Sequence, residues 1–218
     1  MFEENRSIEP VPRATGKLNK TSQSLAVRRT RETQADWVPH LGIEEVRRLA
    51  DTCKERNRLL IQLMFDGCLR VSEATRIRPV DIIHQPDGWV VSVLGKGRKP
   101  GQAAISASLA AQLQAYAYRH RFPPDTILFP VSPSRVFQIV TEAFKKAGMP
   151  VPSKAHDRVG AVHILRHSGA IERLRQTGNP KAVQDQLRHK SAQMTLRYLK
   201  TLSQEESLKV QQQVDYGW

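Results

Sequence analysis

Residues 57–67, NRLLIQLMFDG, are apolar on nearly every side when they are drawn as a helix. A helix without a polar face must be covered by other elements of the same domain. Gly67 follows the last apolar positions and is a residue type that commonly ends helices. The chain has 218 residues, which is enough for one domain with a substantial core. This stretch therefore predicts a central buried helix in a domain built around it.

The apolar spacing elsewhere in the chain is mostly helical. Before the middle of the chain it predicts helices over 43–53 and, capped by Ser72, over 73–77. Later helices are expected over 107–119, over 163–177 with Gly178 at the end, and from Asn179 to about 188. Ser191 is expected to cap a helix that runs through Tyr198, and 204–214 predicts a separate last helix. A further helix begins at Ser132 or Ser134 and reaches about 147, with Val136, Phe137, Val140 and Phe144 facing inward.

The spacing of the apolar residues is no longer helical in the middle of the chain, where β-branched and aromatic residues become frequent. Residues 88–94 and Gln102–Ser106 predict two strands, and GKGRKPG between them is a basic turn. Ile127–Phe129 predicts a short extended piece. The expected fold is mainly α with a small antiparallel β-hairpin or sheet, an α+β domain.

The charge balance indicates a polyanionic partner. Lys plus Arg number 34 against 21 Asp plus Glu, a net charge of +13, and the isoelectric point is about 10.2. Such a balance is typical of nucleic-acid-binding domains, although heparin-binding and membrane-surface proteins share it. The polar N-terminus lacks a signal peptide, no apolar run is long enough to cross a membrane, and the two cysteines form no C-x-x-C pair. These features predict a cytoplasmic, nucleoid-associated protein.

Residues 1–36 show little periodicity and predict a flexible arm ahead of the ordered domain. Between 11 and 31 they carry six positive charges and no acid. Two readings stay open, a solvated tail or an arm that lies along a DNA backbone.

Residues 163–198 concentrate histidine, arginine and tyrosine side chains, which would form a site that binds and attacks a phosphate if they converge. His163 and Arg166 are one helical turn apart and share a face, which we expect to point away from the core, with His167 at the core edge. His189 lies 23 residues beyond Arg166, and Tyr198 lies 9 residues beyond His189. His163 and His167 have the spacing of a metal pair, but no third ligand accompanies them, so no metal is predicted.

This pattern resembles the tyrosine recombinases, the phage-integrase family of DNA-cutting enzymes. H-x-x-R is followed by Leu-x-His-x-Ser and then by a tyrosine. Upstream, Gly67–Glu73 reads like the family's arginine turn, G-x-R-x-S-E, and 95–99 reads like its hairpin lysine motif, G-K-G-x-K. The resemblance covers about residues 38–200, and all six expected positions are filled in order.

The resemblance implies a role for each matched residue in phosphoryl transfer from DNA to tyrosine and back. Tyr198 is the nucleophile, and Arg70 and Arg166 hold the non-bridging phosphate oxygens. Lys96 is the acid for the leaving 5′-oxygen, with Lys99 as a rival, and His163 is the proton shuttle. His189 orients or neutralises the phosphate, Glu73 supports Arg70 or His163, and no metal or other cofactor is required.

The resemblance also implies double-stranded DNA as partner and a homo-tetramer on two synapsed sites, with no membrane. The chain divides into the arm 1–36, a catalytic domain 37–202 and a tail 203–218 that docks on a neighbouring protomer. Candidate DNA contacts outside the catalytic set are Arg28, Arg29, Arg31, Arg98, Lys99, Arg188 and Lys190.

Two departures from the family pattern stand out. Arg188 occupies the place of the usual glycine in L-G-H, where it either reaches the DNA backbone or slows the chemistry. Only about 36 residues precede the catalytic domain, so the chain resembles compact members that lack the N-terminal clamping domain.

The expected activity is site-specific recombination, by integration, excision, inversion or plasmid multimer resolution. The alternatives are a catalytically weak DNA-binding or accessory protein on the same fold, and a type IB topoisomerase-like nicking and closing activity.

Overall fold

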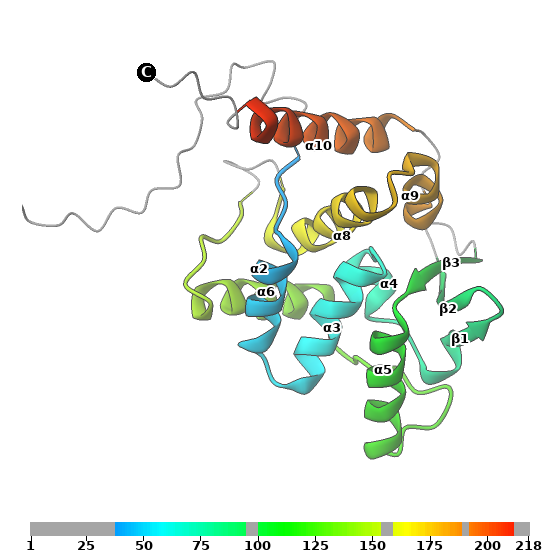
Figure 1. Cartoon of the computed structure of the whole chain (residues 1–218). Helices are drawn as coiled ribbons and strands as arrows, with labels where there is room; N and C mark the ends of the chain where they lie inside the picture. Colours follow the sequence, from blue (N-terminus) through cyan, green and yellow to red (C-terminus); the bar gives the residue numbers. More distant parts are fainter. Residues whose placement is uncertain (1–37, 95–99, 154–158, 189–191, 212–218) are drawn as a thin grey trace, which may run out of the picture.

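A computed structural model describes residues 38–94, 100–153, 159–188 and 192–211. The helices within these ranges form most of the domain, and one small sheet lies at its edge (Figure 1). In chain order the first elements are α2 Ile43–Asp51, α3 Glu55–Asp66, α4 Val71–Ala74, the 3-10 turn η1 Pro79–Asp81, β1 Ile82–Gln85 and β2 Gly88–Leu94. They are followed by β3 Pro100–Ile105, α5 Ala107–Arg119, α6 Pro133–Lys146, α8 Ala161–Thr177, α9 Pro180–Leu187 and α10 Gln193–Gln211.

Helix α3 forms the centre of the core, as its apolar sequence predicts. Leu59, Leu60, Ile61, Leu63 and Met64 are all buried. Helices α2, α5 and α8 each pack against α3, so its apolar sides are covered in turn. Gly67 does end this helix, but with an ordinary right-handed backbone, φ −74°.

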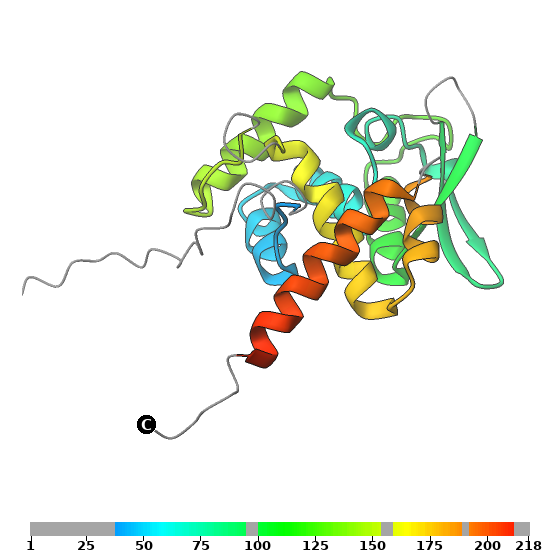
Figure 2. The ribbon, with the colours of Figure 1, turned by 90° about the horizontal axis from the view of Figure 1, so that it is seen from above.

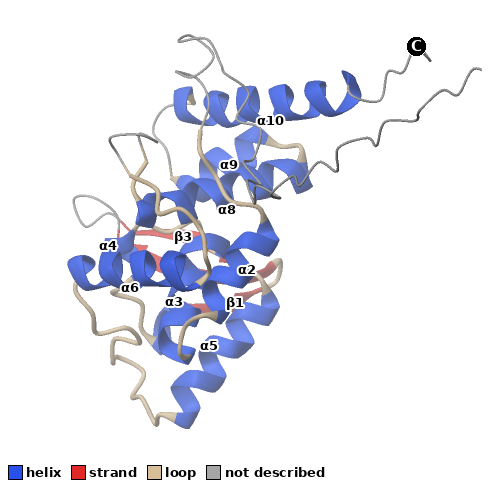
Figure 3. Ribbon diagram, turned by 90° about the vertical axis from the view of Figure 1, so that its left-hand side faces the viewer, coloured by secondary structure: helices blue, strands red, loops and turns tan. Residues whose placement is uncertain are grey.

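The sheet has three antiparallel strands in the order β1-β2-β3. Seen from the opposite side of the molecule, its strands lie behind the helices (Figure 3). Strands β2 and β3 confirm the predicted hairpin, with Val91 opposite Ala103. Strand β1 was not predicted, because its four residues, Ile82–Gln85, follow a proline turn and are too few to show a period. The extended piece Ile127–Phe129 joins no strand.

Two local predictions were wrong. Helix α4 begins after Arg70, not after Ser72, because the Glu73 carboxylate accepts the Arg70 backbone N–H at 2.8 Å and caps the helix there. Phe137 is 51% exposed on α6, although Val136 and Val140 are buried as expected. The Ser132 side chain caps α6 by accepting the Arg135 N–H at 3.2 Å.

The last three helices pack on one another, and α10 crosses over α8 (Figure 2). Helix α8 ends at Gly178 as predicted, with that glycine in the left-handed conformation, and the Asn179 side chain caps α9. Ser191 lies outside the described residues. The two helices expected after it are one continuous helix, α10, because Thr201 and Leu202 are buried and continue its packing past Tyr198.

Candidate active site

Glu73 is the centre of the candidate site. Its carboxylate is almost completely buried at the start of α4. Oε2 accepts the Arg70 backbone N–H at 2.8 Å, and Oε1 accepts a hydrogen bond from the Arg70 guanidinium at 3.1 Å. The Arg70 side chain remains 44% exposed. One buried carboxylate therefore orients a partly exposed guanidinium.

Arg166, on α8, is brought to the same carboxylate from 93 residues further along the chain. Nη1 lies 3.6 Å from Glu73 Oε2 and donates to the backbone carbonyl of Cys68 at 2.5 Å. Nη2 donates to the carbonyl of Leu187 at 2.8 Å. Burial, together with the charge of Arg70, lowers the pKa of Arg166 to about 10, so the group is still a cation at neutral pH.

His163 and Arg166 do not point into a shared open space as predicted. His163 is exposed on α8, whereas Arg166 is only 5% exposed. The i, i+3 relation places both on one side of the helix, but the turn before α4 and the end of α9 cover Arg166. The sequence of α8 alone cannot show that cover.

Two residues beside Arg166 have left-handed backbones although neither is glycine. Cys68 has φ 49° and Arg188 has φ 53°. The carbonyl of Cys68 and the carbonyl of Leu187, which precedes Arg188, are the two acceptors that hold Arg166. A left-handed backbone conformation costs about 1 kcal/mol or more at a residue other than glycine. The turns that carry these carbonyls are therefore held by their surroundings.

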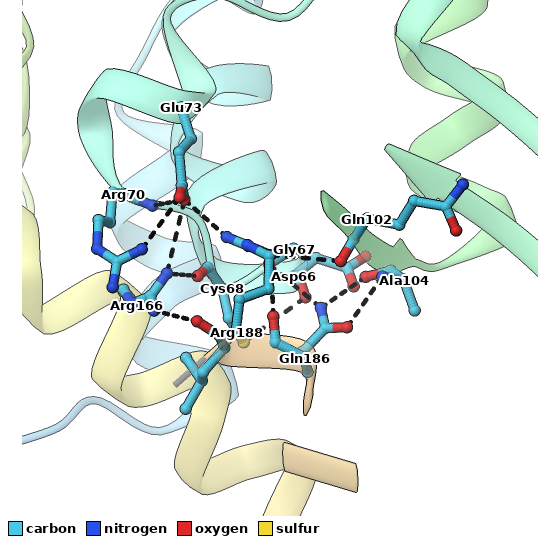
Figure 4. A network of polar contacts seen from close by, with 11 residues as sticks. Asp66, Gly67, Cys68, Arg70, Glu73, Gln102, Ala104, Arg166, Gln186 and Arg188 are labelled. Atoms are coloured by element: carbon cyan, nitrogen blue, oxygen red, sulfur yellow. Dashed lines mark hydrogen bonds and ion pairs between the residues drawn. The ribbon is translucent and has the colours of Figure 1, made fainter. Parts of the chain in front are cut away.

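Arg188 turns inward to the buried carboxylate. Its Nη2 donates to Glu73 Oε2 at 2.8 Å, and its Nη1 donates to the Gln186 carbonyl at 3.0 Å (Figure 4). Only 17% of its side chain is exposed. Glu73 thus contacts three guanidiniums, those of Arg70, Arg166 and Arg188.

The protonation of Glu73 follows from this cluster. Burial alone would raise its pKa, but the Arg70 N–H hydrogen bond and the charges of Arg188, Arg166 and Arg70 hold the pKa below its usual value. Three cations around one anion leave the cluster with a net positive charge, which is the arrangement that binds a phosphate.

Tyr198 lies in a second hydrophobic cluster between α8, α9 and α10. Its ring is fully buried, and burial raises its pKa to about 12 in spite of the positive charge of Arg166. The hydroxyl lies 2.7 Å from Nδ1 of His167. The cluster consists of Val38, Cys68, Ala170, Ile171, Leu174, Val183, Leu187, Tyr198 and Leu202.

His167 is the residue that sequence reasoning underrated. We expected it only to pack at the core edge, and it is half-buried there, but it also contacts the tyrosine hydroxyl. The sequence did offer one signal for this contact. His167 follows Arg166 directly, and a shift of one residue round α8 turns the side chain toward α10.

Several candidate residues lie outside the described residues. They are Lys96 and His189 of the catalytic set and the DNA-contact candidates Arg28, Arg29, Arg31, Arg98, Lys99 and Lys190.

The outer edge of β3 is joined to α9 by side chains that the sequence did not single out. The Gln186 amide accepts the Ala104 N–H and donates to the Ala104 carbonyl, both at 2.9 Å (Figure 4). The same carbonyl accepts Arg173 Nη2 at 2.9 Å, and Arg173 pairs with Asp66. These contacts occupy backbone groups that an edge strand otherwise leaves unpaired.

Comparison with known proteins identifies the family of this chain. The model of the phage integrase family matches residues 40–205. The chain belongs to the phage integrase family, and its mainly helical domain with a three-stranded sheet is the catalytic-domain fold of the tyrosine recombinases.

Curated relatives are also tyrosine recombinases. A tyrosine recombinase of Pseudothermotoga lettingae is 31% identical over 155 residues, which are 69% of this chain and 51% of the relative. Tyrosine recombinase XerA of Pyrococcus furiosus is 30% identical over 71% of this chain and 54% of its own. The chain thus spans about half the length of the curated relatives it matches.

Solved structures share the fold. The XerA recombinase structure aligns with a TM-score of 0.63 and 25% identity over 83% of this chain and 67% of that one. The catalytic domain of bacteriophage HP1 integrase aligns with a TM-score of 0.58 and 22% identity, over 78% of this chain and 92% of that chain. In the described part of this chain, no helix has the length and apolar character needed to cross a membrane.

Proposed function

We propose that this chain is a site-specific recombinase that cleaves and rejoins DNA through a 3′-phosphotyrosine. The observation that carries the proposal is the buried Glu73 carboxylate with Arg70 and Arg166 around it. Two guanidiniums fixed in this way can donate several hydrogen bonds to the non-bridging oxygens of one phosphodiester. Charge that grows on those oxygens in the transition state is stabilised most by such preset donors.

The reaction balances without an external energy source. The Tyr198 oxygen attacks phosphorus, the bond to the 5′-oxygen breaks, and the phosphate stays on tyrosine at the 3′ end. His163 takes the tyrosine proton, and Lys96 protonates the leaving 5′-oxygen. His189 supports the phosphate. Attack by a 5′-hydroxyl from the same or another strand reverses these steps and restores the DNA bond.

Binding to DNA has to bring Tyr198 out of its buried position. Its hydroxyl contacts His167 in the free protein, where a phosphodiester has no access. The proposed reaction therefore includes a movement of α10 once double-stranded DNA is bound. Assembly of a homo-tetramer on two sites, with residues 203–218 docked on a neighbour, completes the proposal.

A DNA-binding accessory role is the second candidate. It is favoured by the buried Tyr198 and by Arg188, which stands where the family usually has glycine. One structure similar in fold is XerH recombinase bound to its difH substrate before cleavage, with a TM-score of 0.62, 24% identity, and coverage of 78% of this chain and 53% of that one. Both candidate functions include DNA binding, so only an assay for DNA cleavage distinguishes them.

A nicked suicide substrate built from DNA flanking the gene tests the proposal. The wild-type chain should form a covalent protein–DNA adduct that resists denaturation, and Tyr198→Phe should bind the DNA but form none. Tyr118→Phe is the matched control, because Tyr118 is 85% exposed on α5. An adduct that persists in Tyr198→Phe would exclude Tyr198 as the nucleophile, and binding without any wild-type adduct would favour the accessory role. Relaxation of supercoiled DNA without strand exchange would indicate a topoisomerase-like enzyme.

A further inference from the structure

Arg188 connects two parts of the molecule that are far apart in sequence. At the end of α9, its Nη2 donates to Glu73 Oε2 at 2.8 Å. Its Nη1 lies 3.5 Å from the carbonyl of Gln102 on β3. One side chain therefore touches both the carboxylate at the centre of the arginine cluster and the strand of the hairpin.

The contact with Glu73 affects what Arg166 can do. Glu73 Oε2 already accepts the Arg70 N–H at 2.8 Å and lies 3.6 Å from Arg166 Nη1. With Arg188 also bonded to this oxygen, Arg166 instead donates Nη1 to the Cys68 carbonyl. If Arg188 were absent, Oε2 would attract Nη1 to hydrogen-bonding distance, because an unpaired lone pair on a buried carboxylate is unfavourable. That shift would move the Arg166 guanidinium within the cluster.

The contact with β3 is close and leaves no spare room. A Cβ atom added at Gly101 would lie 2.7 Å from Cδ of Arg188. Gln186, two residues earlier, holds the same strand edge through the backbone of Ala104. The last turn of α9 and the residue after it thus fix β3 at two points.

We propose that Arg188 is a positioning residue for phosphate binding. Its guanidinium occupies the remaining hydrogen-bonding capacity of Glu73 and holds β3 in place. The Arg70 and Arg166 guanidiniums therefore keep their positions. The inference rests on the proposed function and assigns to the left-handed Arg188 a task that glycine at this position lacks. It differs from a direct DNA contact, because the guanidinium is turned toward Glu73 and is largely buried.

Four variants test this role. Arg188→Met removes the charge and the hydrogen bonds but keeps the length of the side chain. Gly101→Ala keeps the charge but displaces Arg188, since the new methyl group would overlap Cδ. Arg121→Gly is the matched control, because Arg121 is an exposed arginine in the loop after α5 with the same left-handed φ of 53°. Arg188→Lys keeps the positive charge but lacks the paired donor groups of a guanidinium, so it tests whether charge alone restores part of the function.

The readouts are the single-turnover rate of adduct formation at saturating suicide substrate, the Kd for the DNA, and the slope of log Kd against log salt. We expect Arg188→Met to lower the rate on the order of tenfold, as small displacements of phosphate-gripping groups do, with Kd and the salt slope unchanged. Gly101→Ala should lower the rate in the same direction, Arg188→Lys should recover part of it, and Arg121→Gly should match wild type. Circular dichroism at the assay temperature checks that each variant is folded.

Other results would overturn the inference. An unchanged or faster rate in both Arg188→Met and Gly101→Ala would show that the bridge does not position the arginines. A weaker Kd with a salt slope reduced by about 0.9, the value for one phosphate contact, would make Arg188 a DNA contact instead. Failure of the proposed function is recognised separately, because then wild type itself forms no adduct, and this role falls with it.

Discussion

The hydroxyl of Tyr198 lies 2.7 Å from Nδ1 of His167, inside the cluster between α8, α9 and α10. His167 is the direct neighbour of Arg166, so the helix that supplies this proposed phosphate-binding guanidinium also holds the tyrosine. The free protein thereby keeps its proposed nucleophile neutral and shielded.

The alkaline titration of Tyr198 should reveal this shielding. Burial raises its pKa to about 12, so its tyrosinate absorbance should appear later than that of an exposed tyrosine, whose pKa is about 10. The difference between the wild-type titration and that of Tyr198→Phe isolates the Tyr198 step. Tyr118→Phe should instead remove a titration step at the usual tyrosine pKa. A Tyr198 step near pH 10 would contradict the buried position.

The same shift has a consequence for stability. Between pH 10 and about 12 the folded chain keeps a proton on Tyr198 that the unfolded chain has lost. The free energy of unfolding therefore contains a contribution that is complete below pH 10 and is lost as the pH rises toward 12. The decline should be smaller in Tyr198→Phe.

Gly169→Ala should destabilise the domain. A Cβ atom at position 169 would lie 1.9 Å from the carbonyl oxygen of Phe65 and 3.0 Å from Sγ of Cys68, so α8 could not stay this close to α3. We expect a loss of about 1–3 kcal/mol in the free energy of unfolding, as for other overpacked sites. Urea denaturation measures it. Gln176→Ala, on the exposed side of α8, should change the free energy by less than about 0.5 kcal/mol, and equal effects would contradict the close approach.

Removal of residues 11–31 should weaken DNA binding and flatten its salt dependence. The segment carries six positive charges and no acid. If all six contact phosphates, the slope of log affinity against log salt falls by about five. Removal of residues 2–10, which carry three acids and one arginine, is the control and should leave the slope unchanged. An unaltered slope in the first deletion would make the arm a solvated tail.

Truncation of residues 203–218 should separate cleavage from exchange. Adducts with a suicide substrate should still form, while recombination between two sites should be lost. Because α10 continues to Gln211 and Glu205 pairs with Arg175 at 3.1 Å, the truncation also removes that ion pair. Glu205→Gln controls for it, since an exposed pair contributes about 1 kcal/mol or less. Strand exchange by the truncated chain would show that the tail need not dock.

Local patterns predicted most of the fold. The all-round apolar α3, the end of α8 at Gly178 and the Asn179 cap each depend on a few neighbouring residues, and all were confirmed. Strand β1 and the unbroken α10 were missed, since a four-residue strand and a polar helix are stabilised by distant partners. Thr201 in α10, for example, accepts the backbone N–H of Val38.

The site was predictable as a set of residue types but not as an arrangement. Spacing and resemblance selected Arg70, Arg166 and Glu73, whose contact is now seen. Nothing in the spacing indicated that Arg166 would be covered or that Tyr198 would face His167, because both depend on how α9 and α10 lie over α8. The catalytic roles of these residues stay predictions.

The two left-handed residues, Cys68 and Arg188, show that the site demands a pair of dihedral angles and leaves the choice of amino acid open. The angles then set which residues these two positions tolerate. Glycine, asparagine or aspartate would fit, whereas β-branched residues would be strained there.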